Sequence, residues 1–253
     1  MMQTAGPRPL SGETLDAFYR GRIRLFQRKK GYRFSVDAPL LADFIRTKGS
    51  DEILEIGTGS GIIPLLLGRR PFRRITAVEV QPGLAALARR NVALNGLEDR
   101  IGVVRADYRE YEPGRRFDLV FSNPPYIPRA GGFLSRVTEK SVARHELRGG
   151  LGDLMRKTAQ WLKPGGRACF VFPEKRRGDF LAAAGANGLR VRRWRPVKPR
   201  AGELANLFLA EVGPAGRRGQ KKNYGTRIKL PPLVLFKKDG HYTAAAEAVF
   251  SGR

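Results

Sequence analysis

The sequence predicts an α/β protein whose core is a doubly wound, mostly parallel sheet of seven strands with an antiparallel hairpin at one edge. Two observations lead to this fold class. Short apolar runs that suit strands alternate with longer stretches that carry helix caps, and this alternation is typical of a parallel sheet covered by helices. The chain has 253 residues, of which 42% are hydrophobic, so it can bury one substantial core.

Seven segments are predicted to be strands. They cover residues 52–56, 75–80, 101–105, 117–121, 168–172, 189–194 and 204–212. Most are bounded by turn residues and are rich in Val, Ile, Leu or Phe, as expected for buried strands. A polar turn joins the last two, which are therefore expected to pair as the antiparallel hairpin.

Six helices are expected between and after these strands. They run over about residues 38–48, 62–69, 82–95, 146–162, 175–187 and 239–250. Ser35 is placed to cap the first helix, and Pro39 is tolerated only in its first turn. Asn95-Gly96 is a C-terminal stop signal, and Thr243 or Asp239 can cap the last helix.

We expect a single domain over residues 1–253. Residues 1–34 form a basic N-terminal extension, 35–213 the α/β core, and 214–253 a basic loop followed by a C-terminal strand and helix. Residues 1–20 contain several glycines and prolines and are expected to be loosely ordered. A short strand is expected after them, at 23–26. The glycine- and charge-rich segment 127–145 has the length of a substrate-recognition loop.

The chain carries 48 Lys and Arg residues against 23 Asp and Glu residues, a formal net charge of +25. An excess of this size favours a polyanionic partner, most often nucleic acid, although an Arg-rich background composition is the alternative. Three stretches, 20–33, 190–200 and 217–229, hold basic residues and no acid, which favours a binding surface. The residues expected to contact nucleic acid are Arg28, Lys29, Lys30, Arg217, Arg218, Lys221 and Lys222.

The sequence contains no signal for a membrane, an export pathway or a metal. No apolar run approaches the roughly 20 residues of a membrane span, and the start lacks the pattern of a signal peptide. The single cysteine, Cys169, lies in a buried-strand pattern and is expected to be inert core. One cysteine and two histidines provide few metal ligands, so we expect no metal site. A single cysteine also excludes an internal disulfide, and we expect a reducing, cytoplasmic compartment.

A glycine-rich loop follows the strand at 52–56 and opens a helix. Its residues expected to bind a cofactor are Glu55, Gly57, Thr58, Gly59 and Gly61. Glycines there permit a tight turn and a close approach of the backbone to a ligand. The spacing Gly-x-Gly-x-Gly differs from the dinucleotide fingerprint, and Glu55 would repel a pyrophosphate but not a sulfonium amino acid.

Acidic residues follow the next two strands. Glu79 can accept hydrogen bonds from both hydroxyls of a ribose, and Asp107 can accept one from an adenine amino group. Together with the glycine loop, these acids fit an adenosyl ligand. The plainer alternative is that the glycines only turn a strand-to-helix loop and that the acids are solvated.

The strand at 117–121 ends in Ser122-Asn123-Pro124-Pro125-Tyr126. The prolines cannot continue a sheet ladder, so the strand must stop there and present a rigid turn. The Asn123 amide oxygen and the Pro124 carbonyl can accept the two N–H groups of a planar amine, and Tyr126 can stack on a base. The alternative is a proline-rich exit from the strand, with Tyr126 as a core aromatic.

These features resemble a known family. Residues 55–61 with Glu79 and Asp107 look like the class I S-adenosylmethionine-dependent methyltransferases, whose sheet is Rossmann-like, and 123–126 is similar to the signature of their amino-group members. Three further stretches narrow the resemblance to the bacterial tRNA(Val) adenine-N6 methyltransferases, over about residues 26–250. These stretches are 31–38, 143–146 and 239–243.

The resemblance implies an enzyme that uses S-adenosyl-L-methionine to methylate the N6 amino group of an adenine in RNA, beside the anticodon of tRNA(Val). It implies roles near the cofactor for Phe34, Asp37 and Asn123, although the first two also suit a core aromatic and a helix start. The implied catalytic residues are Asn123, Pro124, Pro125 and Tyr126.

Other targets remain open on the residues alone. The same turn would serve the side-chain amide of glutamine in a protein substrate, or an adenine of rRNA or DNA. A protein methyltransferase of that kind usually carries an N-terminal helical domain, whereas about 50 mostly basic residues precede the first core strand here. A non-enzymatic RNA-binding module is the third reading, and the complete cofactor pattern disfavours it.

Overall fold

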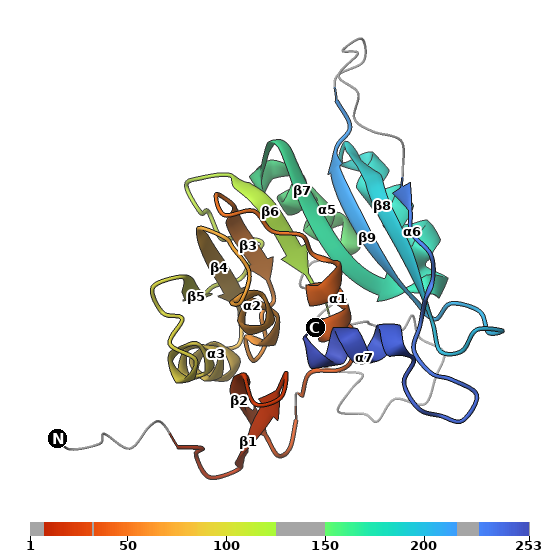
Figure 1. Ribbon diagram of the computed structural model, residues 1–253. Coiled ribbons are helices and arrows are strands. Elements are labelled where there is room, and N and C mark those ends of the chain that lie inside the picture. The colour runs from red at the N-terminus through yellow and green to blue at the C-terminus, as the bar shows by residue number, and fades with distance from the viewer. Residues whose placement is uncertain (1–7, 32, 125–149, 217–227, 253) are drawn as a thin grey trace, which may run out of the picture.

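The computed structural model describes residues 8–31, 33–124, 150–216 and 228–252, and it has the predicted α/β architecture (Figure 1). The main sheet runs in the order β10-β8-β9-β7-β6-β3-β4-β5, with β11 also paired to β8. Its strands are β3 Glu52–Ile56, β4 Arg74–Glu79, β5 Ile101–Arg105, β6 Phe117–Ser122, β7 Leu162–Pro173, β8 Leu189–Lys198, β9 Leu207–Pro214, β10 Ile228–Lys229 and β11 Leu233–Val234. The seven predicted strands are all present, and the two-residue strands β10 and β11 extend the sheet beyond β8.

Helices cover both faces of this sheet (Figure 1). They are α1 Asp37–Phe44, α2 Ile62–Leu67, α3 Pro82–Leu94, α5 Leu151–Trp161, the short 3-10 turn η1 Glu174–Arg176, α6 Arg177–Ala186 and α7 Ala244–Ser251. Side chains alternate along β7: Cys169 and Val171 join the core under α1, α2 and α7, whereas Phe170 and Phe172 join the core under α5 and α6.

The predicted antiparallel hairpin forms, but it is not the outer edge of the sheet. β9 lies between β7 and β8 and is antiparallel to both, so β8 is the outer strand of that hairpin. β10 and β11 then pair parallel to β8, at Arg193–Trp194 and Val197–Lys198. The chain after residue 228 therefore covers an edge that the hairpin alone would leave open.

The expectation that residues 1–20 are loosely ordered is wrong for residues 13–18. This segment is strand β1, Glu13–Phe18, which pairs antiparallel with β2, Ile23–Arg28, in a separate two-stranded sheet. The connecting turn places Tyr19 and Arg20 at positive φ, and the ring of Tyr19 packs against Gly252 at the end of α7. Sequence reasoning does not identify this turn, because Tyr and Arg are not among the residues that usually adopt the left-handed backbone conformation.

Two helix ends also differ from the prediction. Helix α1 stops at Phe44 rather than near Lys48, because Ile45 is extended and Arg70 donates hydrogen bonds to the carbonyls of Ala42 and Ile45. Ser35 lies two residues before the helix, where its hydroxyl accepts from the Asp37 amide at 3.4 Å. Helix α7 begins at Ala244 rather than at residue 239, and of the two predicted caps the structure confirms Thr243, whose hydroxyl accepts from the Ala246 amide.

Candidate active site at the carboxyl edge of the sheet

The site is built where four neighbouring parallel strands end. Strands β6, β3, β4 and β5 are adjacent in that order, so the segments that leave their carboxyl ends lie at one edge of the sheet. Of the predicted site residues, Glu55 and Glu79 lie among the last residues of β3 and β4 themselves, and Gly57, Asp107 and Asn123 lie in the segments that follow β3, β5 and β6. Open α/β sheets bind ligands at this edge, so the fold places these side chains where a ligand is expected.

Backbone hydrogen bonds hold the glycine loop to the neighbouring strand. The amides of Gly57 and Thr58 both donate to the carbonyl of Val78 in β4, at 2.9 and 3.0 Å. Gly61 adopts φ +83°, and a methyl group added there would lie 3.3 Å from Cβ of Ala88 in α3. Gly57 adopts φ +75° with open space where a side chain would be. The loop is thus closely packed on its inner side and open on its outer side.

The carboxylate of Glu79 is part of the same arrangement. One oxygen accepts from the amide of Gly59 and the other from the amide of Gln81, each at 2.9 Å, and the residue is 5% exposed. The predicted role of Glu79 is to accept from ribose hydroxyls. Each carboxylate oxygen has a second lone pair, so the two roles are compatible. Glu79 therefore orients the loop before any ligand is bound.

Glu55 is an acid in an unusual environment. It is 1% exposed, and within the described residues its Oε2 atom has no hydrogen-bond partner; the same holds for the hydroxyl of Ser60. The pKa of Glu55 is raised from 4.5 to about 8, mainly by burial and also by the charge of Glu79, while the neighbouring Thr58 side chain partly opposes the shift. A buried carboxyl of this kind is stabilised in its ionised form by a nearby cation.

These observations fit a cofactor with an adenosyl group and a cationic amino acid. The open side of the glycine loop leaves room for close approach of a ligand, and one oxygen of Glu55, which has no hydrogen-bond partner among the described residues, could face an ammonium or sulfonium. Gly57, Thr58, Gly59 and Gly61 would then line the ligand, with Glu79 at its ribose. Each of these assignments stays a prediction about role, whereas the placement of the residues is a structural result.

Asp107 follows β5 and lies at the far side of this edge. Its carboxylate accepts from the backbone amide of Arg109 at 3.0 Å and from the guanidinium of the same residue through both oxygens. The side chain of Asp107 is 20% exposed. The predicted bond to an adenine amino group would therefore be made by a carboxylate that Arg109 already orients.

Asn123 and Pro124 follow β6 directly and are both half-buried. The preceding residue, Ser122, donates a hydrogen bond from its hydroxyl to the carbonyl of Ile56 at 2.8 Å, which joins the end of β6 to the residue before the glycine loop. Sequence reasoning did not single out this contact of Ser122. The predicted site residues Pro125 and Tyr126, and the expected recognition loop 127–145, lie outside the described residues.

Phe34 lies between the N-terminal hairpin and α1, and Asp37 begins α1. The Phe34 ring packs edge-on against Phe18 at 4.8 Å between centroids and adds to the core beneath the helices. Asp37 is the first residue of α1 and is buried. Both residues therefore have structural roles, and their proposed contacts with a cofactor stay predictions.

Two asparagines attach the hairpin to the site, a role that sequence reasoning did not identify for either residue. Asn91 is completely buried in α3; its side chain accepts from the Phe26 amide and donates to the carbonyls of Phe26 and Ser60. Asn95, one turn later, makes the same pair of bonds with the amide and carbonyl of Arg24. Arg24 and Phe26 are two residues apart in the strand, which spans about 6.7 Å, and Asn91 and Asn95 are four residues apart along the helix, a rise of about 6 Å. The two spacings match, so both asparagines can reach the strand backbone.

The basic residues of the hairpin lie beside the candidate site. Arg28 is half-buried, and its guanidinium packs on Gly83 in the first turn of α3: a methyl group on Gly83 would lie 2.3 Å from Arg28 Nη2. Lys29 and Lys30 are exposed. Arg217, Arg218, Lys221 and Lys222 lie outside the described residues.

The basic stretch 190–200 is not one continuous binding surface. Arg193 pairs with Glu211 at 2.8 Å and lies over the Phe44 ring, Arg195 is 3.8 Å from Asp43, and Arg200 pairs with Glu203 at 3.1 Å. Acids that lie outside the stretch, two of them distant in sequence and Glu203 only three residues from Arg200, thus neutralise part of this cluster. Such pairing cannot be seen in a local count of charges.

The described part of the folded chain contains neither a membrane-spanning helix nor a cluster of metal ligands. None of the helices in the described ranges is long and apolar enough to cross a membrane. Over the same ranges, His, Cys, Asp and Glu side chains form no group of three or more that could hold a metal ion. Cys169 is buried in β7, and burial raises the pKa of its thiol to about 12, as expected for inert core.

Residues 33–181 match the family described as the methyltransferase small domain. A tRNA1(Val) (adenine(37)-N6)-methyltransferase from Aeromonas hydrophila subsp. hydrophila is 30% identical over 215 residues, which are 83% of this chain and 85% of the relative. A protein of the same name from Flavobacteriaceae bacterium strain 3519-10 is 34% identical over 149 residues, which are 58% of this chain but only 62% of the relative.

A solved structure has the same fold. The predicted O-methyltransferase Atu636 from Agrobacterium tumefaciens superposes with a TM-score of 0.61 at 21% identity, covering 86% of this chain and 96% of its own. At this identity the likeness concerns the fold, and it agrees with the Rossmann-like sheet predicted from the sequence.

Proposed function

The chain belongs to the methyltransferase small domain family and, within it, to the tRNA1(Val) (adenine(37)-N6)-methyltransferases, and on that premise we propose that it methylates N6 of the adenine beside the anticodon of tRNA(Val). It is an S-adenosyl-L-methionine-dependent methyltransferase. The observation that carries the proposal is the joint placement of the glycine loop, Glu55 and Asn123 at the ends of β3 and β6.

The cofactor supplies an electrophilic methyl group when it is bound. On the protein side, the open glycine loop would receive its amino acid part, and Glu55 would become ionised beside the positive charge. Glu79 would accept from the ribose while it keeps its bonds to the amides of Gly59 and Gln81. Asp107, oriented by Arg109, would accept from the adenine amino group.

The methyl acceptor would be held by the turn after β6. The N6 lone pair of adenine is delocalised into the ring, which makes the amino group a poor nucleophile. The Asn123 amide oxygen and the Pro124 carbonyl would accept its two N–H groups and favour a pyramidal nitrogen as the bond forms. Because the proton can leave after transfer, positioning and electrostatics supply most of the rate and no strong base is required.

An adenine in the anticodon loop suits such a site. The target base must leave its stack to reach the pocket, and a loop base is already partly unstacked, which lowers that free energy. Tyr126 is proposed to replace the lost stacking. Arg28, Lys29 and Lys30 are proposed to bind phosphates close to the cofactor, since Arg28 packs on the first turn of α3.

Single-turnover methylation tests this function. The enzyme is mixed with a labelled methyl donor and a tRNA(Val) transcript, and the RNA is digested to nucleosides. We expect N6-methyladenosine, and none in a matched transcript that carries guanine at the target position. Label in rRNA, in DNA or in protein glutamine, with no methyladenosine in tRNA(Val), would overturn the proposed substrate.

A further inference from the structure

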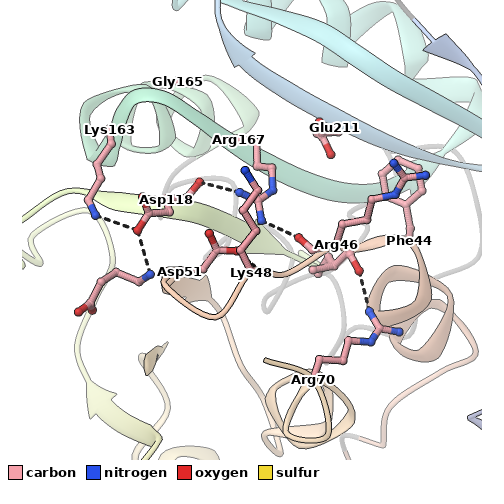
Figure 2. A network of polar contacts seen from close by, with 12 residues as sticks. Phe44, Arg46, Lys48, Asp51, Arg70, Asp118, Lys163, Gly165, Arg167 and Glu211 are labelled. Atoms are coloured by element: carbon pink, nitrogen blue, oxygen red, sulfur yellow. Dashed lines mark hydrogen bonds and ion pairs between the residues drawn. The ribbon is translucent and has the colours of Figure 1, made fainter. Parts of the chain in front are cut away.

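A cavity lies near the amino-terminal ends of β3 and β7, away from the segments that follow β6, β3, β4 and β5. Its volume is about 410 Å³. Its polar side chains come from the segment before β3 and from β7, β8 and β9: Arg46, Lys48, Arg167, Arg192, Arg193 and Glu211. Figure 2 shows Arg46, Lys48, Arg167 and Glu211 gathered around this region. Arg46 and Lys48 precede β3 and so lie at its amino-terminal end, whereas Glu55 lies at its carboxyl end. Glu211 and Arg193 lie on β9 and β8, which β6 and β7 separate from β3, so the cavity is separate from the candidate active site.

Two of the cavity arginines are held by acids. Arg167 donates to Asp51 and to the carbonyl of Arg46, each at 2.6 Å, as Figure 2 shows. Arg193 donates to Glu211 and to the carbonyl of Phe44, both at 2.9 Å, and is only 5% exposed. These pairs neutralise the carboxylates at the cavity, so the remaining cationic side chains set its net charge.

Arg46 and Lys48 supply excess positive charge. Both are exposed, and within the described part of the chain their side chains have no ion-pair partner. Arg192 is the third cation; its Nη1 atom donates to the carbonyl of Gly165 at 3.3 Å. The guanidinium of Arg192 lies flat on Gly213, where a methyl group would be 2.2 Å from its Cζ. The absence of a side chain at residue 213 thus creates the space that Arg192 fills.

From this arrangement we propose that the cavity is a phosphate-binding site. Guanidinium groups and an ammonium facing one concave surface match the charge of a phosphate and its several acceptor oxygens. Among the described residues, none that lines the cavity is aromatic, so its charge is the feature available for recognition. The volume accommodates one phosphate group with its attached ester.

The phosphate has two possible sources, a free phosphate compound or the backbone of the proposed RNA substrate. Strands of five or six residues span about 20 Å, so the two edges of the sheet are separated by the length of about six nucleotide steps. An RNA held by its target base at one edge is long enough to reach the other. The RNA source rests on the proposed function, whereas free phosphate does not.

The test uses the full-length protein and two variants of matched charge. The first, Arg46→Gln with Lys48→Gln, removes the exposed cations of the cavity. The second, Lys237→Gln with Lys238→Gln, removes two exposed cations between β11 and α7. Thermal unfolding is measured in sodium phosphate and in sodium chloride of equal ionic strength. RNA binding is measured as a function of salt with the tRNA(Val) transcript, and cofactor binding by calorimetry.

If the RNA backbone is the source, the cavity variant should lower the slope of log K against log[salt] by about 1.5, with a smaller change in the control. If free phosphate is the source, phosphate should raise the melting temperature of the wild type and the control but not of the cavity variant, with RNA binding unchanged. Either result supports the site.

The proposal is overturned if phosphate and chloride act equally on all three proteins and RNA binding responds equally to both pairs of substitutions. Gly213→Ala provides a second check, because it should displace Arg192 and reproduce the effect of Arg192→Gln without changing the charge. A protein that binds phosphate here but methylates no RNA would refute the proposed function and leave this site standing.

Discussion

The side chain of Glu55 combines complete burial with a position at the tip of a central strand. Its carboxyl is surrounded by β3, the glycine loop and Glu79, and desolvation favours its neutral form. The pKa of Glu55 in the folded chain is about 8, against 4.5 ordinarily. Between these two pH values the folded protein keeps a proton that the unfolded chain has lost.

This difference predicts how stability depends on pH. The contribution of Glu55 should be fully present below about pH 4.5 and should be lost as the pH rises to about 8, by roughly 1.4 kcal/mol for each pH unit. Glu55→Gln cannot ionise and should flatten this part of the curve. Urea unfolding between pH 5 and 8.5 measures it, with Glu247→Gln on the surface of α7 as the control. Parallel curves for wild type and Glu55→Gln would contradict the assignment.

Asn123 is the residue on which the proposed chemistry depends. Asn123→Ala should lower single-turnover methylation roughly a hundredfold, the range for one preorganised electrostatic group. Cofactor affinity should change little, because the amide is proposed to face the methyl acceptor. Rapid-quench kinetics and calorimetry measure the two effects. Asn187→Ala, at the end of α6, is the control. Equal losses of cofactor affinity and rate would show that Asn123 acts on the cofactor instead.

At the scale of elements, the N-terminal hairpin is attached to α3 by asparagine side chains, which hydrogen-bond the backbone of β2 as a neighbouring strand would. Asn91 and Asn95 bond the amide and carbonyl of Phe26 and of Arg24. Arg90 adds two bonds to Glu13 at 2.7 and 2.9 Å. Since Asn91 also bonds the carbonyl of Ser60, the hairpin, the helix and the glycine loop share one buried connection.

Asn91→Ala should therefore destabilise the fold by roughly 2–4 kcal/mol, because it leaves buried backbone groups of Phe26 and Ser60 without partners. Urea unfolding measures the loss, and hydrogen exchange should show reduced protection of the Phe26 amide. Asn95→Ala, whose bonds to Arg24 are exposed, should have a smaller effect. If both variants lose the same stability, the burial of Asn91 is not the reason for its contribution.

For the molecule as a whole, the central sheet isolates its interior from solvent. Cys169 lies in β7 between β6 and β9, is fully buried, and has a thiol pKa raised to about 12 by burial. An aromatic disulfide reagent at pH 8 should therefore react with the native protein at least about a thousandfold more slowly than with the urea-unfolded chain. The rate should increase with urea in step with global unfolding. Rapid reaction without denaturant would show that β7 opens locally.

Local signals in the sequence determined most of the core and the placement of the candidate site. Gly57, Gly61 and Pro124 restrict the backbone within a few residues, and apolar runs mark the strands beside them. A parallel sheet then brings the ends of those strands to one edge, so Glu55 and Asn123 could be assigned to a common site before their contacts were known.

Only the tertiary structure decided which distant groups meet. The hairpin β1–β2 depends on Asn91 bonding the backbone of Phe26, 65 residues away, and the amino-edge cavity depends on strand order bringing Arg46 near Arg192 and Glu211. Acids such as Glu211 turned part of the basic stretch 190–200 into internal ion pairs. The physical reason is that strand order and helix docking follow from summed long-range burial and pairing, which no local pattern of residues contains.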